Sequence, residues 1–286
     1  MMSFSFLRRS VPAFALGLVL MMASAVTAAP VTITVTIQNL APVNGNFLTP
    51  LWVGFHNGGF DIYNPGAPVT PGVERVAEDG LTAAISSEFA ASGAGVVQGT
   101  IMGPVMPEIA PGQTASMAFI VDGSLTSSRY FSYATMIIPS NDAFIANDNP
   151  FAFPVFDSAG NFLGADFIVL GSQVLDAGTE VNDEIPAHTA FFGQMMPNTG
   201  VTENGVVGLH PGFLPPGSGG ILDDPRFMSA DFRAPGYQIA RITVTQGTEP
   251  IPEPATIVLL GTGLAGVAAG VRQRRIGKKD AAVKKK

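Results

Sequence analysis

Apolar and polar residues alternate along two segments, one near each end of the central part of the chain. Residues 31–37 read Val-Thr-Ile-Thr-Val-Thr-Ile, and residues 239–245 repeat the same chemistry. Because successive side chains of a strand point to opposite faces, this alternation predicts strands with one buried and one solvated face. Similar first and last strands predict a closed unit whose two ends lie near each other.

Runs of β-branched and aromatic residues between these segments predict six more strands. Glycine, proline, asparagine and aspartate, which are typical of turns, separate the runs. The predicted strands cover residues 51–56, 96–101, 115–121, 131–138, 167–170 and 228–232. Residues 74–89 are the one stretch with a helical pattern, and residues 57–71 and 185–224 are predicted to be long loops. This succession of short strands and turns predicts an all-β fold, an antiparallel β-sandwich with long loops.

The first 28 residues have the pattern of a secretory signal peptide. Arg8 and Arg9 precede an apolar stretch at residues 11–22, which is shorter than a membrane span. Small residues at 26–28 then provide a cleavage site, so the mature chain is predicted to begin at Ala29.

The last 37 residues form a second separate segment, predicted to be a single membrane helix with basic flanks. Pro252, Glu253 and Pro254 precede an apolar run at residues 256–271. A basic cluster that includes Arg272, Arg274 and Arg275 follows the run and should stay cytoplasmic by the positive-inside rule. The sequence thus predicts three parts: a signal peptide at 1–28, a body at 29–249 and a tail at 250–286.

This order of Pro-Glu-Pro, glycine-rich apolar helix and arginines resembles the PEP-CTERM sorting tail of Gram-negative bacteria. The resemblance implies an exported protein that is anchored transiently in the inner membrane. It also implies an exosortase-type processing enzyme as partner, with delivery to the cell surface or the extracellular matrix. The lysine-rich stretch ending at Lys286 is longer than is usual for such tails.

The net charge of the body restricts the classes of molecule that it can bind. Residues 30–250 contain five arginines, no lysine and 20 carboxylates, a net charge of −15. A field of that sign repels phosphate backbones, so we expect no nucleic-acid partner, and cations are the natural small partners. Acidity that only keeps an exported protein soluble is the alternative. The chain has no cysteine, which excludes disulfides and thiolate metal sites.

Four short segments of the body, taken in order, resemble the spondin-type N-terminal domain of extracellular matrix and adhesion proteins. They are residues 47–57, 80–81, 136–144 and 176–180, and their order and spacing hold across most of residues 31–245. The resemblance implies a β-sandwich of C2-like topology that binds calcium and has no catalytic activity.

Carboxylates that directly follow predicted strands are the candidate calcium ligands. Calcium takes six to eight oxygen ligands from loops, and by resemblance Asp142 and Asp176 match aspartates that bind the metal in spondin domains. Asp122 falls near a third acidic ligand of the family if one insertion is allowed. Glu180 lies close by in sequence and could complete the site, as could Asp183 and Glu184, and an ordinary role in turns is the alternative for each aspartate.

No catalytic constellation stands out. There is no cysteine nucleophile and no G-x-S-x-G elbow, and the three histidines are far apart in sequence. We therefore expect a non-enzymatic, calcium-binding surface or matrix module that acts in adhesion or exopolysaccharide association. An exported hydrolase acting on polysaccharide is the alternative, and it would need two carboxylates in a cleft.

Overall fold

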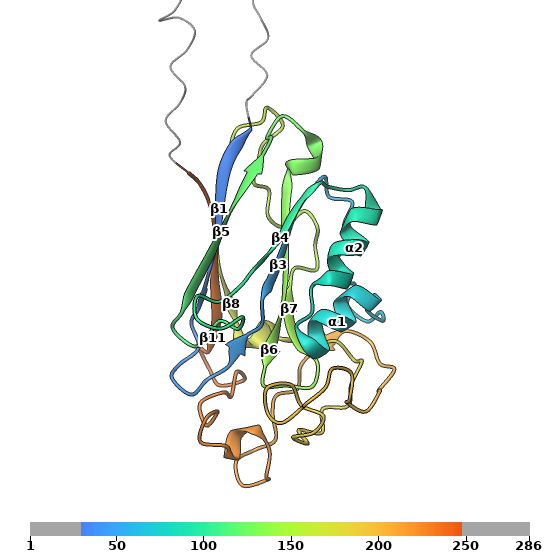
Figure 1. Cartoon of the computed structure of the whole chain (residues 1–286), viewed down its shortest axis with the longest axis vertical. Coiled ribbons are helices and arrows are strands. Elements are labelled where there is room, and N and C mark those ends of the chain that lie inside the picture. The colour runs from blue at the N-terminus through green and yellow to red at the C-terminus, as the bar shows by residue number, and fades with distance from the viewer. Residues whose placement is uncertain (1–29, 248–286) are drawn as a thin grey trace, which may run out of the picture.

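Residues 30–247 are described in a computed structural model of the protein, and the predicted signal peptide and sorting tail lie outside them. Two sheets and two helices make up this part of the chain (Figure 1). The strands are β1 Val31–Asn39, β2 Phe47–Leu48, β3 Leu51–His56, β4 Val97–Ile101, β5 Thr114–Val121, β6 Tyr130–Ile138, β7 Ala143–Ala146, β8 Ala165–Leu170, β9 Leu175–Asp176, β10 Gly208–Leu209 and β11 Gln238–Gln246. The helices are α1 Pro71–Asp79 and α2 Ala83–Ser92.

Both sheets are antiparallel. The first has the order β5-β1-β11-β8, and the second contains β10-β9-β7-β6-β3-β4, with β2 paired to β6. The alternating first and last strands pair with each other, Ile33 opposite Gln246 and Asn39 opposite Ala240. The predicted proximity of the two ends of the body is thereby confirmed.

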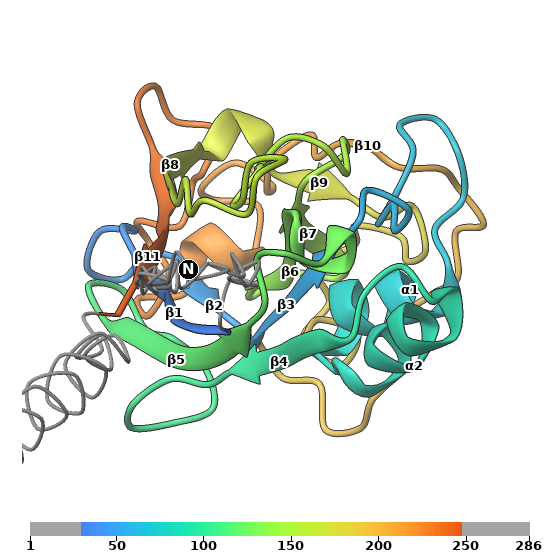
Figure 2. The ribbon, with the colours of Figure 1, turned by 90° about the horizontal axis from the view of Figure 1, so that it is seen from above.

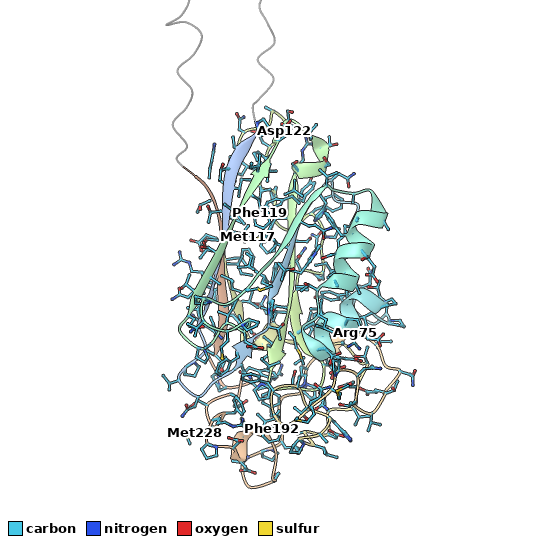
Figure 3. The ribbon with its side chains drawn as sticks, viewed as in Figure 1. Arg75, Met117, Phe119, Asp122, Phe192 and Met228 are labelled. Carbon is cyan, nitrogen blue, oxygen red and sulfur yellow. The ribbon has the colours of Figure 1, made fainter. Side chains whose placement is uncertain are left out.

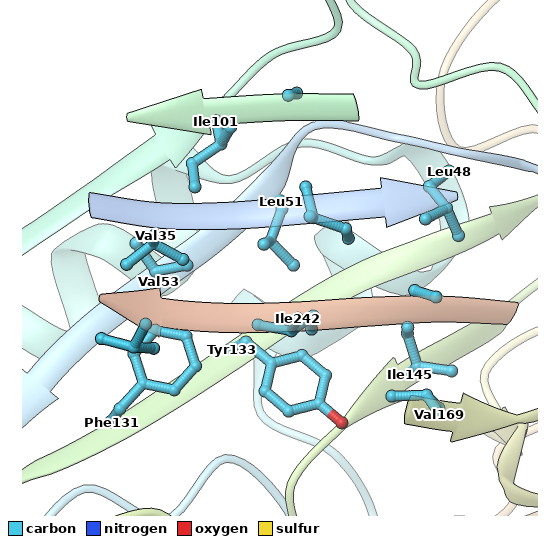
Figure 4. Packing of buried hydrophobic residues seen from close by; sticks show 14 of the residues in the cluster. Val35, Leu48, Leu51, Val53, Ile101, Phe131, Tyr133, Ile145, Val169 and Ile242 are labelled. Carbon is cyan, nitrogen blue, oxygen red and sulfur yellow. The ribbon is translucent and has the colours of Figure 1, made fainter. Parts of the chain in front are cut away.

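The sheets face each other across a continuous apolar core (Figure 4). Val35 and Ile242 from the first sheet meet Val53, Phe131 and Tyr133 from the second. The alternation of β1 accounts for this packing, because Ile33, Val35 and Ile37 are all fully buried while the threonines between them are half-buried.

The second sheet is also covered on its other face, by α1 and α2 (Figure 2). All six residues of β3 are buried: Val53 faces the first sheet, and Trp52 packs against Phe60 and Phe89 on the helix side. The indole nitrogen of Trp52 donates a hydrogen bond of 3.0 Å to Gln98 Oε1. A strand with two covered faces loses its alternation, which is why β3 reads as a continuous apolar run.

Two predictions of secondary structure are wrong. Residues 228–232 form no strand: Ala230 packs with Ile221, Leu222 and Phe227 in a small cluster of loop residues, and Phe232 joins the main core from a turn. The predicted helix at 74–89 is two helices, because Gly80 takes a left-handed conformation (φ +66°) and ends α1. Among residues 30–247, no helix is long and apolar enough to cross a membrane.

His56 ends β3 and is a buried titratable group. Its Nδ1 accepts a hydrogen bond from the backbone N–H of Gly58 (3.0 Å), so Nε2 carries the proton and donates to Ser132 Oγ (2.8 Å). Burial lowers the pKa of His56 to about 4.

The lowered pKa of His56 predicts that this one side chain makes the folded protein less stable in acid. Below the ordinary histidine pKa of 6.5 the unfolded chain binds a proton that the folded chain refuses, so stability falls as the pH drops from 6.5 towards 4. The wild type should therefore lose on the order of 3 kcal/mol more unfolding free energy than His56→Gln between pH 7 and pH 4. Urea unfolding at several pH values measures this. A difference in unfolding free energy between the wild type and His56→Gln that stays constant with pH would contradict this prediction.

Candidate functional site

The connection from β6 to β7 places a buried carboxylate at the edge of the second sheet. Residues 139–142 form this connection, and the Ser140 hydroxyl stabilises it by donating to the Ile137 carbonyl oxygen (2.5 Å) and accepting from the Ala143 N–H (3.1 Å). Asp142, the last residue before β7, has no exposed surface. The sequence pattern of a strand followed by Pro-Ser-Asn-Asp thus leads to a buried turn.

One oxygen of Asp142 organises the turn that follows β9. Asp142 Oδ2 accepts hydrogen bonds from the Thr179 N–H (2.8 Å), the Thr179 hydroxyl (3.2 Å) and the Glu180 N–H (3.1 Å). Asp142 Oδ1 is equally buried but has no hydrogen-bond partner. A buried carboxylate with one free oxygen is costly unless a cation or a donor satisfies it.

Asp176 lies beside Asp142, because Asp176 pairs with Ala143 across the β7–β9 ladder. Its two oxygens accept from the Gly178 N–H (2.7 Å) and from the side-chain amide of Asn182 (2.6 Å). Gly178 has a φ of +67°, a left-handed conformation that this tight turn requires. Asn182 is held in turn by His210 Nε2, 2.9 Å from its oxygen.

Burial and neighbouring negative charge raise the pKa values of Asp142 and Glu180. Burial, followed by the negative charge of Asp176, raises the pKa of Asp142 to about 7. Burial, followed by the charge of Glu78, raises the pKa of Glu180 to about 8. The side chain of Arg75 is near the group, but it pairs with Asp79 and, at 3.4 Å, with Glu78.

Glu180 turns its side chain away from Asp176 and towards α1. Its Oε1 accepts from the Gly200 N–H (3.0 Å), and its Oε2 is buried without a partner. A pocket of about 280 Å³ opens there, bounded by α1 on one side and the 178–180 turn on the other.

Glu78 of α1 lines the same pocket and was not identified from the sequence. It is 3% exposed, and burial is the main cause of its raised pKa. The available signal was the pair Glu78-Asp79 in the last turn of a helix, where the helix dipole disfavours negative charge.

Asp183 and Glu184 neighbour the site and stabilise its loops. Asp183 contacts His188 Nδ1 (2.7 Å) and the amide of Asn141 (3.2 Å). Glu184 accepts from the backbone N–H groups of Ile221 (2.7 Å) and Leu214.

Asp122 is not brought into this group. It follows β5 near the start of β6, whereas Asp142 follows the end of β6, a strand of nine residues that spans about 30 Å. Figure 3 shows Asp122 at one end of the sandwich and Phe192 and Met228 at the opposite end. The Asp122 carboxylate caps its own turn by accepting from the N–H (2.9 Å) and the hydroxyl (2.6 Å) of Ser124.

Within residues 30–247, no three acidic or histidine side chains converge on a point where they could hold a metal ion together. A cation beside Asp142 would therefore take further oxygens from backbone carbonyls and water, which calcium accepts readily.

Comparison with known proteins identifies the C-terminal segment. Residues 250–275 match the PEP-CTERM protein-sorting motif. The chain is an exported protein with an exosortase sorting tail. The match confirms the sequence prediction for Pro252, Glu253 and Pro254 and for Arg272, Arg274 and Arg275, all of which lie inside it. No curated protein matches the chain.

The sorting tail predicts a defined mature end. Processing of the exported protein should leave a surface form that ends near residue 254, without the apolar run and the basic residues. Intact mass spectrometry of the protein released from cells measures this end. A released chain that still carries Lys286 would show that the tail is not removed.

Proposed function

We propose that the body of this exported protein is a non-enzymatic, calcium-binding domain of the spondin type. One observation carries the proposal: the Asp142 carboxylate is completely buried beside Asp176, and its Oδ1 has no hydrogen-bond partner. A bound cation would satisfy that oxygen and offset the repulsion between the two carboxylates.

The residues present fit calcium better than a transition metal. The available ligands are carboxylate and carbonyl oxygens on loops at the edge of a sheet, which calcium prefers, and neither cysteine nor a group of histidines contributes. Asp142 and Asp176 would hold the ion, and the ion would join the β6–β7 connection to the turn after β9. Glu180 is the next carboxylate along that turn.

The proposed role is at the cell surface, in adhesion or in association with exopolysaccharide. The sorting tail directs the protein there, and the resemblance of the body to spondin-type domains suggests an extracellular binding module. The lysine-free body, with its excess of carboxylates, is suited to calcium-rich surroundings and unsuited to nucleic acid.

The pocket lined by Glu78 and Glu180 is the observation that favours the alternative, a hydrolase acting on polysaccharide. Glycoside hydrolysis needs a protonated carboxyl group beside an ionised one. The pKa values of Glu78 and Glu180 are both raised, so their environments do not separate one protonated group from one ionised group as this chemistry requires. The arrangement therefore favours a binding function.

The calcium proposal predicts a stability difference. With calcium at about a hundredfold excess over Kd the folded state gains about 2.7 kcal/mol, which for a domain of this size raises Tm by roughly 5–10 °C. Asp142→Asn combined with Asp176→Asn keeps the side-chain shapes but removes both charges, so its Tm should barely respond. Thermal unfolding with calcium and with chelator measures both.

Asp122→Asn combined with Asp157→Asn is the matched control, because Asp157 lies in an exposed turn whose Gly160 contacts Gly123 beside Asp122. It removes the same charge at positions away from Asp142, and its Tm should rise with calcium as the wild-type Tm does. Equal wild-type Tm values with millimolar calcium and with chelator would refute the calcium site.

A further inference from the structure

The pocket beside Glu180 has walls of two chemical kinds. Its volume is about 280 Å³, and three carboxylates face it, from Glu74 and Glu78 of α1 and from Glu180. Pro68 and Val69, which precede α1, add an apolar wall. The other lining residues are neutral: Gly178, Thr179, Asn198, Gly200, Thr202, Asn204 and Gly205. The pocket is thus an acidic cavity without a basic side chain in its lining.

The Glu180 carboxylate lacks one hydrogen-bond donor. Glu180 is 2% exposed, and its Oε1 accepts a hydrogen bond from the backbone N–H of Gly200. Its Oε2 has no hydrogen-bond partner. A buried carboxylate oxygen without a hydrogen-bond partner favours binding of a cationic donor from outside the chain.

The shape of the pocket favours an organic cation over a metal ion. The carboxylates line different walls and do not converge, since no trio of acidic or histidine side chains in the described residues could hold one ion. The volume is several times the roughly 30 Å³ that one water molecule occupies in the liquid. A charged group at the end of an aliphatic chain would fill such a space, and the aliphatic chain would pack against Pro68 and Val69.

We propose that this pocket binds a lysine side chain of a partner protein. A primary ammonium has three diverging N–H donors and no acceptor, which suits acceptors on several walls. An arginine guanidinium binds most strongly to both oxygens of one carboxylate. Glu180 offers only one, and Glu78 already shares Oε2 with Arg75 at 3.4 Å. Residues 30–250 contain no lysine, and the lysines of the chain lie at positions 278–286 in the sorting tail. The surface form that ends near residue 254 would therefore take its lysine ligand from another protein.

The test is calorimetric titration of the purified surface form, from which the lysine-containing tail has been removed, with Nα-acetyl-lysine methylamide at low and at high calcium concentration. Nα-acetyl-norleucine methylamide, which has the stem without the amine, and glucosamine, whose amine is on a sugar, are titrated alongside. Lysine amide should bind and the other two should not. Glu180→Gln and Glu78→Gln should each weaken binding about tenfold or more, the loss expected for one charged hydrogen bond.

Glu203→Gln is the matched control, because Glu203 is exposed, adjacent in sequence and outside the pocket lining. Its affinity for lysine amide should equal that of the wild type. Absence of lysine-amide binding, equal binding of norleucine amide, tighter binding of glucosamine, or competition by calcium would each overturn the proposal. An equal loss in Glu203→Gln would also overturn it, because the effect would then be one of net charge.

Discussion

The loop-rich end of the sandwich depends on the burial of one carboxylate. Asp142 accepts three hydrogen bonds from Thr179 and Glu180, and these bonds fix the turn after β9 against the β6–β7 connection. In the segment that continues from this turn, Asn182 and Glu184 contact the loops around residues 210–221, and Asp183 contacts His188. A long stretch without regular structure thereby becomes ordered through side-chain-to-backbone bonds rather than through a sheet.

The same arrangement concentrates negative charge. Burial and then the charge of Asp176 raise the pKa of Asp142, and burial and then the charge of Glu78 raise the pKa of Glu180. Arg75 is the basic side chain near them, and it is engaged with Asp79 and Glu78. Burial of carboxylates in this way lowers the stability of the fold without ligands, and both proposals assign the compensating charge to a bound cation. The two proposals divide this charge between an inorganic ion at Asp142 and an organic cation at Glu180.

The alternation of apolar and polar residues predicted the strands that have one buried and one exposed face. The alternation of residues 31–37 and 239–245 identified β1 and β11, because one face of each is buried and the other is not. Asp142 and Asp176 were selected through the resemblance to spondin-type domains, and β7–β9 pairing brings them together. Tertiary packing decided the rest. The helical layer that covers β3 was not predicted, residues 228–232 found no strand partner, and Glu78 reaches the site only through the docking of α1.

The pairing of β1 with β11 has a consequence for orientation. The chain enters the body at Val31 and leaves it after Gln246, and Ile33 lies opposite Gln246 at the end of the sandwich that also carries Asp122. The sorting motif begins at residue 250, and its apolar run begins at residue 256, ten residues after Gln246, a length of chain that reaches at most about 35 Å. If that run anchors the protein in the inner membrane before processing, the Asp122 end is the end tethered to the bilayer. The Asp142 end, at the opposite end of the sandwich, would then face away from the bilayer.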